Sequence, residues 1–172
     1  MYNSASFGVL TSLYFTYSLH KISADNYSMK NSPIVIVEDD EDDCEMLVNV
    51  FREIGVANEF RCFLHPVKAI EYLKTTKEIP FLIISDINMP YMDGFAFKKV
   101  IDLDTTISNK RIPFVFLSTA KENNLIDESF HLSIQGYFQK PNDLESLKEI
   151  AHAIVVYWKH GAFKHKLPFA RA

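Results

Sequence analysis

Residues 34–40 read IVIVEDD, four consecutive β-branched residues followed by three acids. An unbroken apolar run without alternation is typical of a strand that is covered on both faces of a parallel sheet. The acids come directly after the run, where such a strand would end. This stretch therefore predicts a buried parallel strand with carboxylates at its carboxyl end.

Similar apolar runs recur along the chain, each separated from the next by a segment of helical periodicity. Strands are expected at 34–37, 59–63, 81–85, 113–117 and 136–139, and helices at 42–54, 66–73, 95–103, 123–132 and 143–158. Gly55 is placed to end the first helix, Pro66 to begin the second and Asp143 to cap the last. This alternation predicts an α/β fold with a five-stranded parallel, doubly wound sheet and helices on both faces.

Polar side chains follow four of the expected strands at the point where each strand ends. They are Glu38 and Asp39 after the first strand, Asp86 after the third, Ser118 after the fourth and Lys140 after the fifth. A doubly wound sheet gathers the carboxyl ends of its central strands into one cleft, where the strand order reverses. We therefore expect these side chains to lie close together.

Together these side chains have the chemistry of a phosphoryl-transfer site. Clustered carboxylates repel one another and become tolerable around a cation, and hard oxygen ligands with open positions for water suit Mg²⁺. Asp86 would be the nucleophile, while Lys140 and Ser118 would contact phosphoryl oxygens. Each residue alone could be a helix cap, a turn residue or a surface charge. Their joint placement at separate strand ends favours the functional interpretation.

The same stretches resemble the receiver domains of bacterial two-component response regulators, of the stand-alone, single-domain type. The resemblance covers residues 32–158 and rests on IVIVEDD at 34–40, SDINMPYMDG at 85–94, FLSTA at 116–120 and GYFQKP at 136–141. It implies a flavodoxin-like strand order, 2-1-3-4-5. The stretch 102–111 is longer and more polar than the minimum found in the family. It resembles a subgroup of stand-alone receivers that work with phytochrome-type or hybrid histidine kinases.

The resemblance implies a role for each residue of the metal site. Asp86 matches the phosphoacceptor of the family. Glu38 and Asp39 match the acidic pair that binds Mg²⁺, with Asp39 as the direct ligand, whereas the role of the third acid, Asp40, is left open. The backbone carbonyl of Asn88 matches the position that completes the metal site.

The resemblance also implies a conformational switch. Ser118 matches the switch hydroxyl, and serine keeps this group where threonine is commoner. Tyr137 matches the switch aromatic that turns inward when the hydroxyl moves. Lys140 matches the phosphate-contacting lysine, and the Lys140–Pro141 bond would be cis.

The implied function is that of a signalling switch, not an enzyme, because it would catalyse only its own phosphorylation and dephosphorylation. A histidine kinase or a phosphotransfer protein would donate to Asp86 in the presence of Mg²⁺, and an unknown downstream protein would read the changed surface. The expected compartment is the cytoplasm, and the expected state is a monomer or a weak homodimer. Two other classes stay open. One is a pseudo-receiver that serves interaction without phosphotransfer; the other is a haloacid-dehalogenase-type phosphatase, which places Asp-x-Asp after its first strand.

Composition limits the class of protein further. The chain has 172 residues, of which 48% are hydrophobic and 23% charged, and a net charge of −4. These values are typical of a soluble globular domain and argue against direct nucleic-acid binding. Residues 7–19 are mostly apolar but too few to span a bilayer, so no membrane association is expected.

The two ends of the chain and its cysteines carry separate expectations. Residues 1–31 are expected to be an N-terminal extension, either disordered or an over-called start with Met29 as the initiator. Residues 32–160 would form the receiver domain and 161–172 a short basic tail. Cys44 and Cys62 are expected to be reduced, buried thiols, as in a cytosolic protein.

Overall fold

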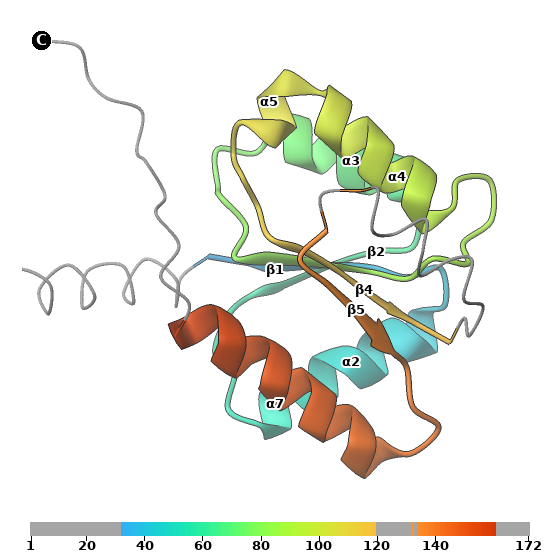
Figure 1. The fold of residues 1–172 in the computed structure, drawn as a ribbon, viewed down its shortest axis with the longest axis vertical. Helices are drawn as coiled ribbons and strands as arrows, with labels where there is room; N and C mark the ends of the chain where they lie inside the picture. The colour runs from blue at the N-terminus through green and yellow to red at the C-terminus, as the bar shows by residue number, and fades with distance from the viewer. Residues whose placement is uncertain (1–31, 120–131, 133, 161–172) are drawn as a thin grey trace, which may run out of the picture. The chain divides into compact units, whose positions relative to one another are not determined.

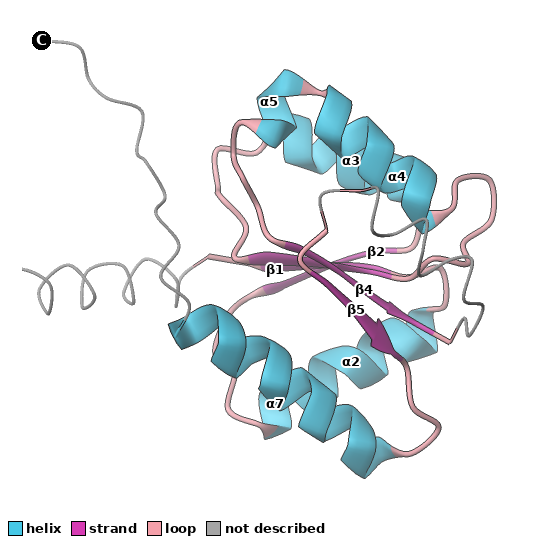
Figure 2. Ribbon diagram, viewed as in Figure 1, coloured by secondary structure: helices cyan, strands magenta, loops and turns pink. Residues whose placement is uncertain are grey.

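The computed structural model describes residues 32–119, 132 and 134–160, without the side chains of residues 159 and 160. They form a five-stranded sheet of order β2-β1-β3-β4-β5 in which all neighbouring strands are parallel (Figures 1 and 2). Its strands are β1 (Ile34–Val37), β2 (Phe60–Phe63), β3 (Leu82–Ser85), β4 (Phe114–Ser118) and β5 (Gly136–Gln139). The predicted fold class and strand order are confirmed.

Helices cover both faces of the sheet. They are α2 (Glu41–Glu53), α3 (Pro66–Thr75), α4 (Gly94–Leu103), α5 (Thr105–Ser108) and α7 (Leu144–His160). Helices α2 and α7 pack together on one face, and α3, α4 and α5 lie on the other (Figure 1). The helix expected at 123–132 lies outside the described residues, apart from Leu132. No helix among the described residues is long and apolar enough to cross a membrane.

The central strands are buried along their whole length, as their unbroken apolar sequences predict. Every residue of β1, β3 and β4 is buried. Val35 and Val37 belong to the apolar cluster that includes Phe97 of α4. Because successive side chains of a strand point to opposite faces, Ile34 and Ile36 face α2 and α7. These three strands are therefore covered on both sides, and polar residues occur only at their ends.

The helix boundaries follow the local signals in the sequence. Gly55 lies just past α2 with φ +81°, a left-handed conformation that glycine adopts without strain. Pro66 occupies the first turn of α3. The carboxylate of Asp143 accepts a hydrogen bond of 2.9 Å from the amide of Ser146 in α7. All three residues that were predicted to begin, end or cap a helix are confirmed.

The longer stretch before β4 contains the short helix α5, which the sequence did not predict. Asp104 caps it by accepting from the amide of Thr106 at 2.9 Å, and its carboxylate also pairs with Lys74 of α3 at 2.9 Å. Ile107 is 1% exposed, whereas the rest of the helix is polar. A four-residue helix with one apolar side chain is too short to show helical periodicity.

Cys44 and Cys62 form a disulfide, so the expectation of reduced, buried thiols is wrong. Their sulfurs lie 2.16 Å apart and their Cα atoms 6.4 Å apart. Cys44 on α2 is buried, but Cys62 on β2 is exposed. Reduced thiols were expected because the cytosol is reducing, whereas the fold places the two cysteines side by side. The crossover through α2 returns the chain beside β1, with Cys62 level with Ile36.

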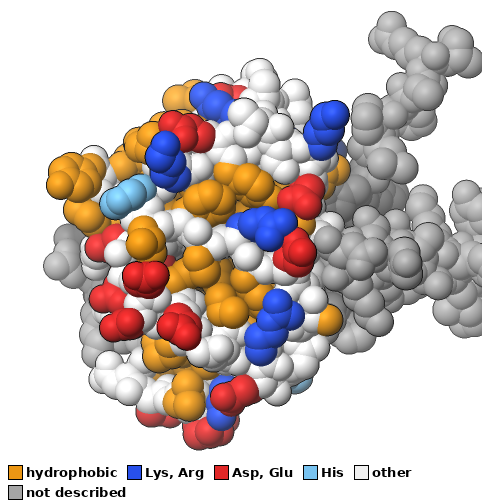
Figure 3. Space-filling view, turned by 180° about the vertical axis from the view of Figure 1, so that it is seen from behind, with side chains coloured by type: hydrophobic (Ala, Val, Ile, Leu, Met, Phe, Trp, Pro, Cys, Tyr) orange, Lys and Arg blue, Asp and Glu red, His pale blue; other side chains and the backbone are white. Residues whose placement is uncertain are grey.

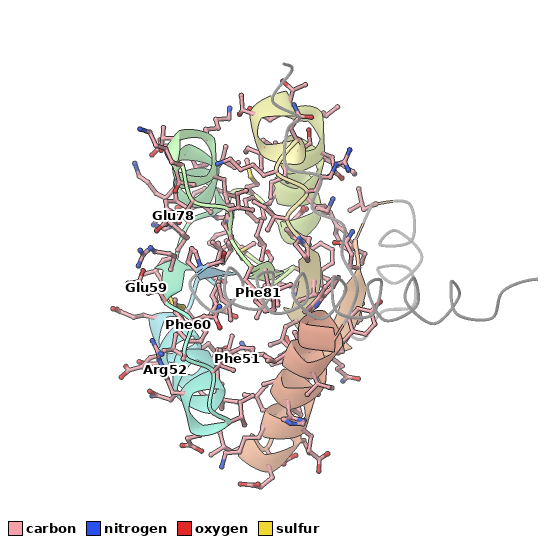
Figure 4. The ribbon with its side chains drawn as sticks, turned by 90° about the vertical axis from the view of Figure 1, so that its left-hand side faces the viewer. Phe51, Arg52, Glu59, Phe60, Glu78 and Phe81 are labelled. Carbon is pink, nitrogen blue, oxygen red and sulfur yellow. A yellow bond between two sulfur atoms is a disulfide. The ribbon has the colours of Figure 1, made fainter. Side chains whose placement is uncertain are left out.

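The disulfide lies near the edge of the sheet formed by β2, which has a polar sequence for a strand. The Phe60 ring lies 5.7 Å from the Phe51 ring, and the Arg52 guanidinium lies 4.9 Å from the Phe60 centroid (Figure 4). Arg61 also pairs with Glu59 at 2.6 Å. Charged side chains along an edge strand discourage pairing with further strands.

Candidate functional site

The polar residues that follow the strands meet at the carboxyl edge of the sheet. Val37 of β1 lies level with Ser85 of β3 in the strand register. The amide of Asp86 donates to the carbonyl of Val37 at 2.9 Å. Glu38 and Asp86 therefore leave neighbouring strands at the same level.

Three carboxylates form a cluster at this edge. Glu38, Asp39 and Asp86 each have a carboxylate oxygen within 4.8 Å of the others. Glu38 is buried, Asp86 half-buried and Asp39 exposed, and acidic side chains gather toward the left of the molecule when it is seen from behind (Figure 3). Burial raises the pKa of Glu38, and the negative charges of Asp86 and Asp43 raise it further. The hydrogen bond and the charge of Lys140 lower it, but the pKa of Glu38 still lies above its ordinary value.

One carboxylate oxygen of Asp86 is buried without a hydrogen-bond donor in the described part of the chain. Its Oδ1 atom is buried and accepts no hydrogen bond from the described residues. Burying an unpaired charged oxygen is costly, and a hard divalent cation held by three carboxylates would satisfy it. The donor set thus fits a hard divalent cation.

The loop after β3 holds Asp86 firmly in place. The amide of Gly94 donates to the Ile87 carbonyl at 2.8 Å, and the Ser85 hydroxyl donates to the Asp86 carbonyl at 2.7 Å. A Cβ on Gly94 would lie 2.8 Å from a ring carbon of Phe116 and 2.9 Å from the Cα of Ile87, closer than real Cβ atoms approach. Only glycine fits between α4 and this loop.

Lys140 reaches the acidic cluster from β5. Its amide donates to the Ser118 carbonyl at 2.8 Å, which fixes the start of the loop after β5. Its ammonium pairs with Glu38 Oε2 at 2.9 Å and with Asp43 Oδ2 at 2.5 Å. Burial alone would lower the pKa of Lys140, but hydrogen bonds to Asp43 and Glu38 outweigh it and raise the pKa above its ordinary value. Neither of the two ion pairs involves Asp86.

The other predicted residues lie around this cluster. Ser118 is fully buried at the end of β4. Tyr137 of β5 is partly buried against the apolar core, and burial, followed by the charge of Asp86, raises the pKa of its phenol. Asn88 is exposed in the loop after β3. The structure therefore brings together the three acids and Lys140, with Ser118 on the neighbouring strand.

The acidic run at 38–45, EDDEDDCE, holds one contact that the sequence did not predict and one residue whose role it left open. Asp40 is the N-cap of α2, where its carboxylate accepts from the amide of Asp43 at 3.1 Å. The side chain of Asp43 then reaches Lys140. A signal existed in the helical phase, because Asp43 precedes the buried residues Leu47 and Val50 by four and seven positions.

The expected cis bond between Lys140 and Pro141 is absent. The described residues contain no cis peptide bond. The trans form is the intrinsically preferred one for an X–Pro bond, so this expectation is corrected.

Comparisons with known proteins agree with the geometry. The family model of the response regulator receiver domain matches residues 34–152. The response regulator Rcp1 of Synechocystis sp. is 26% identical over 130 residues, which cover 73% of this chain and 87% of Rcp1. The transcriptional regulatory protein FlgR of Helicobacter pylori is 34% identical over 116 residues, which cover 67% of this chain but 28% of FlgR.

Solved structures show the same fold. The phosphorylated cyanobacterial phytochrome response regulator RcpA superposes with a TM-score of 0.69 and 29% identity, covering 77% of this chain and 97% of RcpA. The Mn²⁺-bound form of Rcp1 gives a TM-score of 0.65 and 23% identity, with the same coverage of 77% and 97%.

The chain belongs to the family of response regulator receiver domains. Such a domain is a signalling switch of two-component systems rather than a classical enzyme, and it implies a cognate histidine kinase.

Proposed function

We propose that this receiver accepts a phosphoryl group on Asp86 and so switches a protein-interaction surface. The donor is a histidine kinase or a phosphotransfer protein, and Mg²⁺ is the cofactor. The observation that carries the proposal is the buried, unpaired Oδ1 of Asp86 within the cluster of Glu38 and Asp39. Two similar proteins support the proposal: RcpA has been solved in a phosphorylated form and Rcp1 in a Mn²⁺-bound form.

The residues at the strand ends divide the work of phosphoryl transfer. Glu38, Asp39, Asp86 and the Asn88 carbonyl would hold Mg²⁺, which neutralises charge on the phosphoryl oxygens. A carboxylate oxygen of Asp86 attacks phosphorus while the P–N bond of the donor phosphohistidine breaks, and the imidazole leaves with the bonding electron pair. The product is an acyl phosphate on Asp86. In this way the receiver catalyses only its own phosphorylation and dephosphorylation.

Lys140 and Ser118 act on the transferred group. The Lys140 ammonium pairs with a phosphoryl oxygen, and the Ser118 hydroxyl donates a hydrogen bond to another. Movement of Ser118 toward the phosphoryl group opens space that Tyr137 fills by turning inward. This biases a two-state surface around β5 and α7, which a downstream protein reads.

The setting of this activity follows from the family and from charge. We propose residues 32–160 as the receiver domain, 1–31 as an extension and 161–172 as a basic tail. The proposed state is a monomer or a weak homodimer in the cytoplasm, with no direct binding to nucleic acid because the net charge is −4. Disulfides are rare in a reducing cytoplasm, so the oxidation state of Cys44 and Cys62 in cells tests this compartment.

Phosphorylation of purified variants tests the proposal. The wild type should gain the mass of one phosphoryl group from acetyl phosphate when Mg²⁺ is present and lose this ability when the metal is chelated. Asp86→Asn should remain unlabelled. Asp42→Asn is the matched control, because Asp42 is an exposed acid that does not belong to the cluster of Glu38, Asp39 and Asp86. This variant should be labelled normally. An unlabelled wild type would favour a pseudo-receiver that works by interaction alone.

A further inference from the structure

Lys140 is shared between the acidic cluster and a carboxylate from outside it. One of its partners is Glu38, a member of the cluster, at 2.9 Å; the other is Asp43 of α2, at 2.5 Å. The Lys140 side chain is 6% exposed, whereas the Asp43 side chain is 41% exposed. The lysine assigned to the phosphoryl group is thus held, before phosphorylation, by a carboxylate at the mouth of the site.

The helix fixes Asp43 in this place. Its amide is bound by the N-cap Asp40 at 3.1 Å, and the next residue, Cys44, is buried and covalently joined to β2. The first turn of α2 is therefore anchored at both its cap and its buried face. The Asp43 carboxylate meets Lys140 from a rigid support rather than from a mobile side of the cleft.

We propose that Asp43 is a positioning residue that draws Lys140 away from Asp86 and so lowers the readiness of this receiver to be phosphorylated. The proposal rests on the proposed function of Asp86. An ammonium has three donor hydrogens, and two of them serve Glu38 and Asp43. The third hydrogen is left for a phosphoryl oxygen at Asp86, so Asp43 and this oxygen compete for the position of the ammonium rather than for one hydrogen.

Charge acts in the same direction as this competition. Phosphorylation replaces the single negative charge of Asp86 by about two, and the Asp43 carboxylate adds a further negative charge beside the ammonium that should neutralise them. An anionic phosphodonor approaches the same cleft. Removing the charge of Asp43 while keeping its shape should therefore speed phosphorylation.

The helix offers a matched control. Asp42 is adjacent in sequence and equally acidic, but it is exposed and lines a groove with Glu45, Asn49 and Leu144 where α2 meets α7. It makes no ion pair with Lys140. Asp42→Asn changes the net charge by the same amount as Asp43→Asn without releasing the lysine.

The test compares rates of phosphorylation by acetyl phosphate at saturating Mg²⁺, followed by intact mass. Asp43→Asn should be phosphorylated about fivefold faster than the wild type, the effect expected for one partly solvated charge a few ångströms away. Asp42→Asn should change the rate much less. Asp43→Glu, which keeps the charge, should restore a rate near that of the wild type; a purely structural role for Asp43 would not give this pattern.

The outcomes separate this inference from the proposed function. Equal rates for Asp43→Asn and Asp42→Asn, or a slower rate for Asp43→Asn, would overturn the positioning role while leaving Asp86 as phosphoacceptor. A wild type that is never labelled, or an Asp86→Asn variant that is labelled like the wild type, would overturn both.

Discussion

At the scale of single residues, the site combines an unsatisfied acceptor with a tightly packed support. Asp86 Oδ1 is buried and unpaired, and the loop that carries Asp86 packs against Gly94 with no room for a side chain. The packing at Gly94 and the position of Asp86 are therefore coupled, because a side chain at residue 94 would have to displace the backbone of Asp86 or of α4.

Gly94→Ala tests this coupling. The added methyl group would overlap the loop and the Phe116 ring, so we expect a loss of about 1–3 kcal/mol in the free energy of unfolding and slower phosphorylation of Asp86. Urea denaturation and intact mass would measure the two effects. Gly55→Ala is the control: it is strained by its positive φ, but its methyl group would meet nothing within 4 Å. It should lose stability without slowing phosphorylation. A Gly94→Ala variant that keeps full stability and rate would contradict the packing argument.

The sequence predicted much of the site at this scale, because strand ends in a doubly wound sheet are few. Glu38, Asp39 and Asp86 meet as expected. The second partner of Lys140 was not predicted, since Asp43 belongs to a run in which seven of eight residues are acidic. Only the phase of the helix distinguishes Asp43 within that run.

At the scale of elements, α5 shows how a polar insertion becomes ordered. Asp104 caps the helix and pairs with Lys74 of α3. The Lys110 ammonium donates to the carbonyls of Leu73 and Thr76 at 2.7 Å each. These contacts tie the stretch to α3, and they depend on tertiary proximity that sequence periodicity does not show.

The charge state of Asp104 gives a pH prediction. Hydrogen bonds from Thr106 and Lys74 lower the pKa of Asp104 from 3.8 to about 2. Because the folded-state pKa is depressed, the stabilisation from the ionised carboxylate is present above pH 3.8 and is lost as the pH falls through about 2. NMR titration of the Asp104 carboxyl should give a midpoint near 2 in the wild type and a higher one in Lys74→Met. A wild-type midpoint near 3.8 would refute this account.

The disulfide gives a second prediction for the elements. It joins α2 to β2 across 18 residues, and a crosslink of this span restricts the unfolded chain by about 3 kcal/mol. Cys62→Ser removes the exposed partner and should lower the free energy of unfolding by about this amount. Reductant should lower the stability of the wild type similarly and leave Cys62→Ser unchanged. If reductant has no effect on the wild type, the disulfide does not contribute as argued.

At the scale of the whole molecule, the fold follows from where the apolar residues lie. Strands β1, β3 and β4 are buried throughout, so the polar chemistry can gather only at their ends. The alternation of strands and helices made this architecture predictable. The disulfide was not predictable in the same way, because Cys44 and Cys62 are brought together only after α2 packs on the sheet.

The most direct test of the account is to locate the phosphoryl group in the intact protein. Phosphorylated protein is reduced with borohydride, which converts a phosphoaspartate to homoserine, and its peptides are sequenced by mass spectrometry. We predict homoserine at position 86 only, with Asp42→Asn giving the same result and Asp86→Asn giving none. Homoserine at another acid such as Asp39, with residue 86 unchanged, would contradict the assignment of Asp86 as the phosphoacceptor.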